Sequence, residues 1–221
     1  MNFMKTEEKM TENQENPGKK RIRRKKIGIF GGSFNPVHNG HIRIAQEAMK
    51  ACRLSEVWFI PAGDPYMKAG TDMLAAEDRL RILEQALSGL PGFSADPIEI
   101  LREGESYTVD TLEELTERHP DCRFFLIVGE DAFHQMPLWK SPERILKLAE
   151  LVVAGRDTEC GDVPDYDTEP LPVPEKRLHR IMTQIDISST KIRRMIREGA
   201  CIRGLVPEQA EELIIRYYSE Q

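Results

Sequence analysis

Long apolar runs are absent from this sequence of 221 residues, of which 40% are apolar. No segment approaches the roughly 20 consecutive apolar residues that a membrane-spanning helix needs, so we expect no membrane span. Residues 1–26 are polar and charged and contain no apolar stretch of the kind found in a secretory signal. These two absences favour a cytoplasmic protein that does not act at a membrane.

Cysteine is also scarce, and the cysteines form no CxxC pair. The four residues are Cys52, Cys122, Cys160 and Cys201. Scattered cysteines of this kind favour reduced thiols, as is usual in the cytoplasm, and we expect most of them to be buried.

Positive charge is concentrated in one short segment. The net charge is −6, but residues 19–26 (KKRIRRKK) carry seven positive charges, which leaves −13 on the remainder. A basic run can contact nucleic acid or an anionic surface. The few aromatics and many charges of residues 1–25 instead favour a disordered basic tail. The acidic remainder argues against a nucleic-acid-binding domain, so we expect anions to bind only at a local site.

From residue 26 onward, strand and helix signals alternate, and we predict a single domain over 26–221. Short apolar runs predict strands at 26–30, 57–60, 98–101, 124–128 and 151–154. Apolar residues at helical spacing predict helices from about residue 40, over the segment with Leu80, Leu83 and Leu87, at 108–118, and from about residue 189. Residues 157–180, rich in Pro, Asp and Glu, are predicted to be an irregular surface excursion.

The alternation of strands and helices predicts an α/β fold, a Rossmann-like, doubly wound parallel sheet with helices on both faces. Ligands of such sheets bind outside the carboxyl ends of the strands. The polar candidates of this sequence follow the predicted strands that end at Phe30, Ile60, Val128 and Ala154.

Residues 27–41, IGIFGGSFNPVHNGH, combine a short apolar strand, a glycine turn and a helix start. Gly31 and Gly32 let the backbone approach an anion, and the N-terminus of a helix attracts phosphate. His38 and His41 stand at the mouth of this turn and point to chemistry on a phosphate, whose charge we expect them to neutralise. The P-loop pattern GxxxxGK[ST] and the pattern GxGxxG are both missing.

Two other interpretations of this turn stay open. The glycines alone are compatible with a simple tight turn beside two incidental histidines. Two histidines three residues apart are also compatible with a shared zinc ion, although no third Cys, His or carboxylate stands nearby at ligand spacing.

A second phosphate-binding helix start is predicted at residues 187–193, which read ISSTKIR. Ser189 or Thr190 is a suitable N-cap, and Gly199 is a suitable stop. Hydroxyls at a helix start, followed by Arg193, suit the β- and γ-phosphates of a nucleotide. The alternative is an ordinary capped helix whose arginines lie in water.

These motifs resemble those of a known superfamily. Residues 38–41, His-Asn-Gly-His, resemble the HxGH signature of the nucleotidylyltransferases, and ISSTKIR resembles the motif that closes their triphosphate site. Three further segments are similar to bacterial nicotinate-nucleotide adenylyltransferases: 102–112 (REGESYTVDTL), 125–131 (FLIVGED) with Leu138-Trp139, and 152–156 (VVAGR). The resemblance runs from residue 27 to about residue 218 and implies a fold of the HxGH nucleotidylyltransferase type.

The resemblance also implies three sets of site residues. The catalytic set, at the phosphates of ATP, is His38, His41 and Arg193. The other implied ATP-binding residues, of which Gly129, Asp131 and Arg156 face the adenosine, are Gly31, Gly32, Ser33, Phe34, Gly40, Gly129, Asp131, Arg156, Ile187, Ser188 and Ser189. The residues implied for nicotinate mononucleotide are Lys68, Tyr107, Thr108, Leu138 and Trp139.

Some of these residues have ordinary structural interpretations as well. Trp139 alone is more typical of a core aromatic, and Thr108 or Asp131 of a helix cap. Residues 65–68 read Pro-Tyr-Met-Lys where the family often has Pro-Pro-His-Lys, so no histidine role is transferred there. Asn35 stands where aspartate is frequent, and we expect it near the phosphates.

The implied reaction joins MgATP and nicotinate mononucleotide to give nicotinate adenine dinucleotide and pyrophosphate, a step of NAD biosynthesis. The mononucleotide phosphate attacks directly and in line, without a covalent enzyme intermediate. Magnesium is expected to be bound by the phosphates of ATP rather than by protein ligands. The implied partners are these two nucleotides, without nucleic acid or membrane, and a homo-oligomer stays open.

Rival functions remain at this stage. Within the superfamily they are nicotinamide-mononucleotide, pantetheine-phosphate and glycerol-phosphate nucleotidylyltransferases, although residues 102–112 and Trp139 favour nicotinate. The rival from another class is a non-enzymatic nucleotide or nucleic-acid binder that acts through the basic tail.

Overall fold

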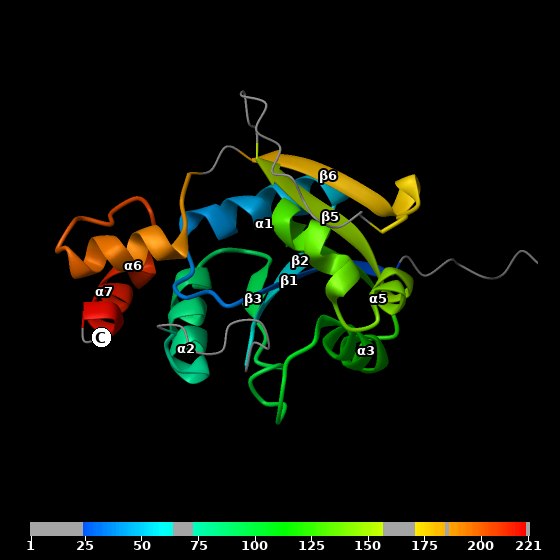
Figure 1. Ribbon diagram of the computed structural model, residues 1–221, viewed down its shortest axis with the longest axis horizontal. Helices are drawn as coiled ribbons and strands as arrows, with labels where there is room; N and C mark the ends of the chain where they lie inside the picture. Colours follow the sequence, from blue (N-terminus) through cyan, green and yellow to red (C-terminus); the bar gives the residue numbers. More distant parts are fainter. Residues whose placement is uncertain (1–23, 64–72, 157–170, 184–185, 220–221) are drawn as a thin grey trace, which may run out of the picture.

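The computed structural model describes residues 24–63, 73–156, 171–183 and 186–219. These residues form a six-stranded sheet in which all neighbouring strands are parallel (Figure 1). The spatial order is β3-β2-β1-β4-β5-β6. The strands are β1 Lys25–Gly32, β2 Glu56–Pro61, β3 Phe93–Ala95, β4 Cys122–Gly129, β5 Ala149–Arg156 and β6 Leu178–Thr183.

The strand order changes direction at β1. The strands β2 and β3 lie on one side of β1, and β4, β5 and β6 lie on the other. Such a switch point leaves a crevice at the carboxyl ends of the two central strands, here β1 and β4. The predicted Rossmann-like α/β fold is confirmed, and this edge of the sheet is where a ligand site is expected.

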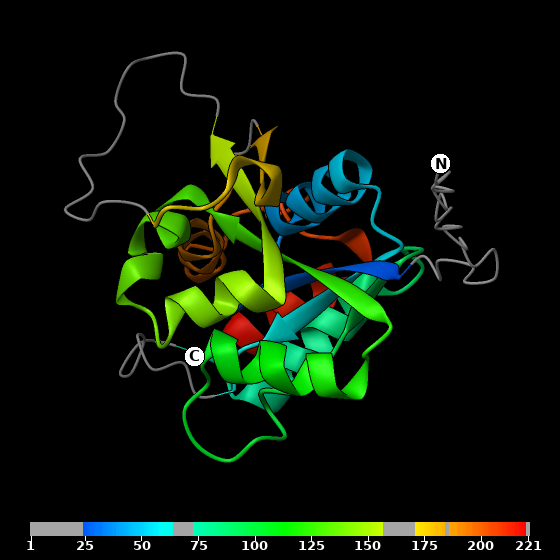
Figure 2. The same cartoon turned by 90° about the vertical axis from the view of Figure 1, so that its right-hand side faces the viewer.

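Helices cover both faces of this sheet (Figure 2). The helices are α1 Asn39–Cys52, α2 Ala76–Leu87, α3 Thr108–Arg118, α4 Glu130–Gln135, α5 Pro142–Leu148, α6 Ser189–Arg197 and α7 Glu211–Ser219, with short 3-10 turns at Met136–Leu138, Glu175–Arg177 and Glu208–Ala210. Side chains of α1, α2, α6 and α7 share one apolar core with Phe30, whereas α3, α4 and α5 share another with Ile27 and Ile29. The alternation of side chains along β1 therefore separates the two cores.

Four of the five predicted strands are present, with ends shifted by one or two residues, but the strand predicted at 98–101 is wrong. The third strand is β3, and the chain turns after it. The Asp96 carboxylate accepts from the N–H of Ile98 at 3.0 Å, and the Pro97 carbonyl accepts from the N–H of Leu101 at 2.9 Å. These local bonds form a turn that buries Ile98 and leaves Leu101 76% exposed.

The prediction of an irregular segment at 157–180 is wrong for its last residues. Residues 175–177 form a 3-10 turn, and β6 begins at Leu178 and pairs with β5. Of the six side chains in β6, only Ile181 and Thr183 are buried. The apolar residues of β6 follow no regular alternation, so the sequence pattern did not indicate this edge strand. Residues 157–170 lie outside the described residues.

The structure tests only part of the predictions about the cysteines and the basic tail. Cys52 is buried, but Cys122 is half-buried and Cys201 is exposed, so the expectation of mostly buried thiols is wrong for the described cysteines. Cys201 lies two residues after Gly199, which ends α6 with a φ of 67°. Cys160 and the tail up to residue 23 lie outside the described residues. No described helix is long and apolar enough to cross a membrane.

Candidate active site

The turn between β1 and α1 is anchored by an aromatic side chain of its own. Phe34 is buried, has a positive φ of 43°, and packs against Phe30 and Phe59 with ring centroids 5.8 and 5.7 Å apart. A Cβ on Gly32 would lie 3.1 Å from the Phe34 ring, so this glycine lets the ring fold back under the turn. Gly31 is exposed and has open space where a Cβ would lie, so an anion can approach the backbone there.

His38 and His41 stack at the start of α1, with ring centroids 3.7 Å apart. His38 is the N-cap residue, and its backbone N–H donates to Nδ1 of His41 over 3.2 Å. Because Nδ1 accepts this bond, the proton of a neutral His41 ring lies on Nε2. Gly40 is buried in the first turn between them. The His41 donor therefore stands at a helix N-terminus, which itself attracts phosphate.

Burial makes the two histidines chemically different. His38 is only 7% exposed, and this burial lowers its pKa from 6.5 to about 4. Its Nδ1 is enclosed without a hydrogen-bond partner among the described residues. His38 is therefore uncharged at neutral pH. The expectation that both histidines neutralise the charge of a bound phosphate stays a prediction, and the uncharged state of His38 applies to the protein without a ligand.

The start of α6 lies against the same turn, although the two segments are about 150 residues apart. The Ser189 hydroxyl donates to the carbonyl oxygen of Pro36 at 2.9 Å, and Nη1 of Arg193 donates to that of Asn35 at 2.7 Å. The N-cap is Ser188, which accepts from a backbone N–H of α6 at 3.2 Å, so the prediction of residue 189 or 190 as the cap is wrong by one or two positions. The structure thus brings the two predicted phosphate motifs together.

The Asn35 side chain points into the protein rather than toward a phosphate site. Its Oδ1 accepts from the Tyr218 hydroxyl at 2.5 Å and from the N–H of Leu74 at 3.2 Å, and the residue is buried. The expectation that Asn35 faces the phosphates is therefore corrected. A carboxamide serves here as an internal acceptor that ties α7 to the turn.

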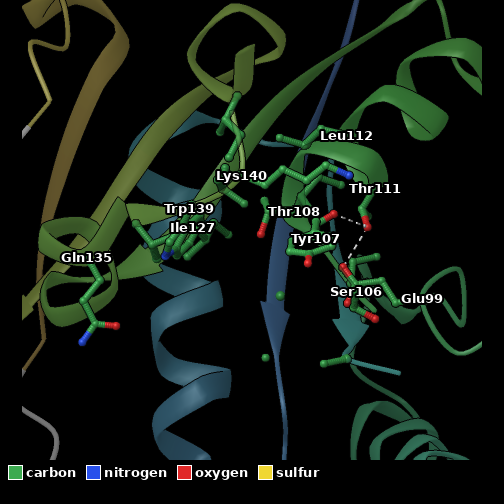
Figure 3. Close-up of a pocket in the computed structure, with 18 of the residues that line it drawn as sticks. Glu99, Ser106, Tyr107, Thr108, Thr111, Leu112, Ile127, Gln135, Trp139 and Lys140 are labelled. Atoms are coloured by element: carbon green, nitrogen blue, oxygen red, sulfur yellow. Dashed lines mark hydrogen bonds between the residues drawn. The ribbon is translucent and has the colours of Figure 1, made fainter. Parts of the chain in front are cut away.

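On the other side of the glycine turn lies a cavity of about 460 Å³. Four of the residues predicted for the mononucleotide line it: Tyr107, Thr108, Leu138 and Trp139. Gly31, Gly32 and Ser33 form part of its wall. Figure 3 shows Trp139 and Gln135 on one side of this cavity and Ser106, Tyr107 and Thr108 on the other. Polar lining residues that sequence reasoning missed are Glu99, Ser106, Thr111, Gln135 and Lys140.

Glu99 is a buried carboxyl group in the wall of the cavity. Thr111 donates to its Oε1 at 2.8 Å and accepts from Nη1 of Arg102 at 3.0 Å. Burial raises the pKa of Glu99, while the Thr111 bond and the Arg102 charge oppose this shift. The sequence signal for Glu99 is a lone glutamate inside the apolar run 98–101, the segment whose predicted strand is absent.

Positive charge and backbone donors meet at the start of α3. The N-cap of this helix is Tyr107, which makes no side-chain cap bond, and Thr108 is the first helical residue. The Lys140 ammonium lies 4.6 Å from the centre of the Tyr107 ring and 2.8 Å from a carboxylate oxygen of Asp110. A helix N-terminus without a side-chain cap is a site for a carboxylate.

Trp139 is both a core residue and a cavity residue. It is half-buried and packs against the apolar cluster of α3, α4 and α5, and it also lines the cavity. Leu138 beside it is 69% exposed. The two interpretations offered by the sequence are therefore compatible.

The remaining predicted residues lie around the ends of β4, β5 and α6. Gly129 is the N-cap of α4, and Asp131 lies exposed in its first turn, where an acidic side chain is favoured by the helix dipole. Arg156 ends β5, and Ile187 packs against the apolar core just before α6. Lys68 lies outside the described residues. No group of three or more His, Cys, Asp or Glu residues that could hold a metal ion occurs in the described part of the chain.

Known proteins are similar to this chain in sequence. A model of the family described as cytidylyltransferase-like matches residues 29–195. A probable nicotinate-nucleotide adenylyltransferase of Geobacillus thermodenitrificans is 40% identical over 89% of this chain and 84% of its own length. One of Lachnoclostridium phytofermentans is 34% identical over 87% of this chain and 98% of its own length.

A solved structure supports the fold. Plasmodium falciparum nicotinic acid mononucleotide adenylyltransferase, complexed with NaAD, superimposes with a TM-score of 0.66 at 17% identity. The match covers 89% of this chain and 98% of that one. From the family model and the sequence relatives, this chain belongs to the nicotinate-nucleotide adenylyltransferases of the cytidylyltransferase-like family.

Proposed function

We propose that this chain transfers the adenylyl group of ATP to nicotinate mononucleotide and releases pyrophosphate. The observation that carries the proposal is the position of the glycine turn, which borders two sites. Residues 31–33 line the cavity, and the chain then leads into the stacked histidines and the docked start of α6. Substrates held on the two sides of this turn bring their phosphates together beside it.

The cavity suits the pyridine ring of the mononucleotide. Trp139 and Tyr107 supply aromatic surface for a flat ring, and a cavity of about 460 Å³ has room for it. The start of α3 offers backbone N–H groups for the nicotinate carboxylate, with the Lys140 ammonium nearby. Nicotinamide lacks that carboxylate, so this corner favours nicotinate over nicotinamide.

The other side of the turn suits the triphosphate of ATP. Two helices, α1 and α6, begin there, and each N-terminus attracts phosphate. His41 adds an N–H donor, and the Arg193 guanidinium places positive charge directly behind the turn. Gly129, Asp131 and Arg156, at the ends of β4 and β5, are proposed to face the adenosine.

In the proposed reaction, an oxygen of the mononucleotide phosphate attacks the α-phosphorus of ATP. A new P–O bond forms as the bond to the β-phosphate oxygen breaks, and pyrophosphate leaves. The attacking phosphate is already anionic, so no side chain has to remove a proton. The protein aligns two anions that repel each other and stabilises charge on the leaving group. Magnesium enters with ATP as part of the substrate.

Pyrophosphate release from ATP tests the proposal directly. Nicotinate mononucleotide should support turnover with at least a tenfold higher kcat/KM than nicotinamide mononucleotide, the equivalent of about 1.4 kcal/mol. Equal use of both acceptors would contradict the role of the α3 start. Deletion of residues 1–23 serves as the control for a tail-dependent binder, and we expect it to leave turnover unchanged. A cytoplasmic location remains part of the proposal.

A further inference from the structure

Arg79 is a buried arginine that the proposed reaction does not use. It lies on the apolar face of α2 together with Ile82, Leu83 and Ala86, and it is only 1% exposed. Burial lowers its pKa below the usual value for arginine, yet a guanidinium keeps its charge at neutral pH. Among the described residues, it forms no ion pair with Asp or Glu, and its hydrogen bonds all go to backbone carbonyls. A buried charge without a countercharge costs stability, so packing alone would favour an apolar residue here.

The guanidinium joins three segments of backbone. Its Nη1 donates to the Ser33 carbonyl at 2.8 Å, and its Nη2 donates to those of Ala62 at 2.6 Å and Gly63 at 3.2 Å. Its Nε donates to the Leu74 carbonyl at 3.0 Å. Ser33 follows β1 and Ala62 follows β2, and both line the cavity. One planar group therefore sets the spacing of the two loops that border the site.

The direction of these carbonyls also sets the direction of neighbouring N–H groups. The peptide bonds after Ser33 and Ala62 are trans, and in a trans peptide the C=O and N–H point in opposite directions. The N–H groups of Phe34 and Gly63 consequently point away from the guanidinium. Within the described part of the chain, neither N–H donates to a protein acceptor. Outward-pointing backbone N–H groups are donors for phosphate oxygens.

We infer that Arg79 is a positioning residue for adenylyl transfer, which holds the loops after β1 and β2 so that the N–H groups of Phe34 and Gly63 face the reacting phosphates. Arg79 itself contacts no substrate. The loop after β2 is held from its other side as well, since a Cβ on Gly63 would lie 2.3 Å from the Glu99 carbonyl oxygen. The inference rests on the proposed function, because the expected effect of Arg79 is on the rate of adenylyl transfer.

Arg79→Lys tests the inference, because lysine keeps the charge but cannot bridge Ser33 and Ala62 with a planar fork. A misplacement of about 1 Å costs roughly 10²-fold in rate, so we expect kcat to fall by about that factor while KM for both substrates stays near wild type. Arg81→Lys is the matched control on α2, because Arg81 is exposed and bonds the Tyr217 hydroxyl at 2.7 Å. It should leave kcat unchanged.

A second variant separates positioning from folding. Guanidinium ion at a concentration far below denaturing levels should restore part of the kcat of Arg79→Ala, whereas sodium chloride at the same concentration should not. A folded Arg79→Lys protein with wild-type kcat would overturn the inference, as would failure of that variant to fold at room temperature. No pyrophosphate release by the wild-type chain would instead contradict the proposed function.

Discussion

The two sides of the glycine turn bind their proposed ligands with different kinds of groups. On the α1 side, the polar side chains are already bonded to protein backbone, as Ser189 is to Pro36 and Arg193 to Asn35. The groups that remain to contact a ligand on this side are mainly the backbone N–H groups at the helix starts and the His41 ring. On the cavity side, ligand contact comes from side-chain surfaces such as Trp139 and Tyr107.

This difference predicts different kinetic behaviour for the two sides. Groups that stabilise charge on a phosphate under attack act mostly in the transition state, so their loss lowers kcat. Side chains that only hold the pyridine ring act equally in ground state and transition state, so their loss raises KM. Variants on either side of the turn therefore test whether the division is real.

His41→Ala should have the largest effect. Loss of one transition-state donor typically lowers kcat by roughly 10²–10³. His119→Ala is the matched control, because His119 packs edge-on against Trp58 and does not line the cavity. Steady-state pyrophosphate release and thermal unfolding should show a folded, slow His41 variant and a control with wild-type turnover. Wild-type turnover in His41→Ala would remove His41 from the site.

His38 should show itself in the pH dependence of stability. Its folded pKa of about 4 lies below the ordinary 6.5, so the unfolded chain takes up a proton first as the pH falls. The contribution of His38 to stability is therefore constant above about pH 7 and declines between pH 6.5 and 4, by about 3 kcal/mol in total.

His38→Asn is the variant to compare, because asparagine keeps a favourable N-cap without titrating in this range. Urea unfolding at a series of pH values gives the unfolding free energy of both proteins as a function of pH. Between pH 6.5 and 4, this free energy should fall by about 3 kcal/mol less in the variant than in the wild type. Parallel curves would mean that the pKa of His38 is the same in the folded and the unfolded chain, and would contradict its lowering by burial.

Trp139→Ala should chiefly affect the mononucleotide. We expect KM for nicotinate mononucleotide to rise about tenfold through the lost aromatic contact, while kcat and KM for ATP change little. Trp58→Ala is the control, since Trp58 donates to Glu56 at 3.0 Å and does not line the cavity. A drop in kcat without a change in KM for nicotinate mononucleotide would contradict the proposed difference between the two sides.

The sequence indicated the phosphate side of the site more completely than the cavity side. The glycines, the histidines and the ISSTKIR segment lie in continuous motifs, so their spacing was enough to predict a shared site. Trp139 and Thr108 were found only by resemblance. Glu99 and Lys140 were missed because they join the cavity through tertiary contacts that no local pattern records.

Two buried charged residues stand within apolar sequence patterns. Glu99 stands in the apolar run that was predicted to be a strand, and Arg79 stands on the apolar face of α2. A charged residue at a buried position is expensive, so each was a signal of a special contact. The position of Asn35, an uncharged residue, was wrong for another reason, because its buried side chain bonds to Tyr218, 183 residues along the chain.

Tyr218→Phe should have the smallest effect on turnover, and it tests whether the bond between α7 and the glycine turn contributes to the phosphate side. It removes a buried hydroxyl that donates to Asn35, but Oδ1 keeps the bond from Leu74, so we expect a loss of about 1 kcal/mol in unfolding free energy. Tyr217→Phe, which breaks only an exposed bond to Arg81, should cost less. Turnover should stay near wild type in both. A strong fall in kcat of Tyr218→Phe would instead mean that α7 helps to position the turn. The link would run through Asn35, whose backbone carbonyl accepts from Arg193.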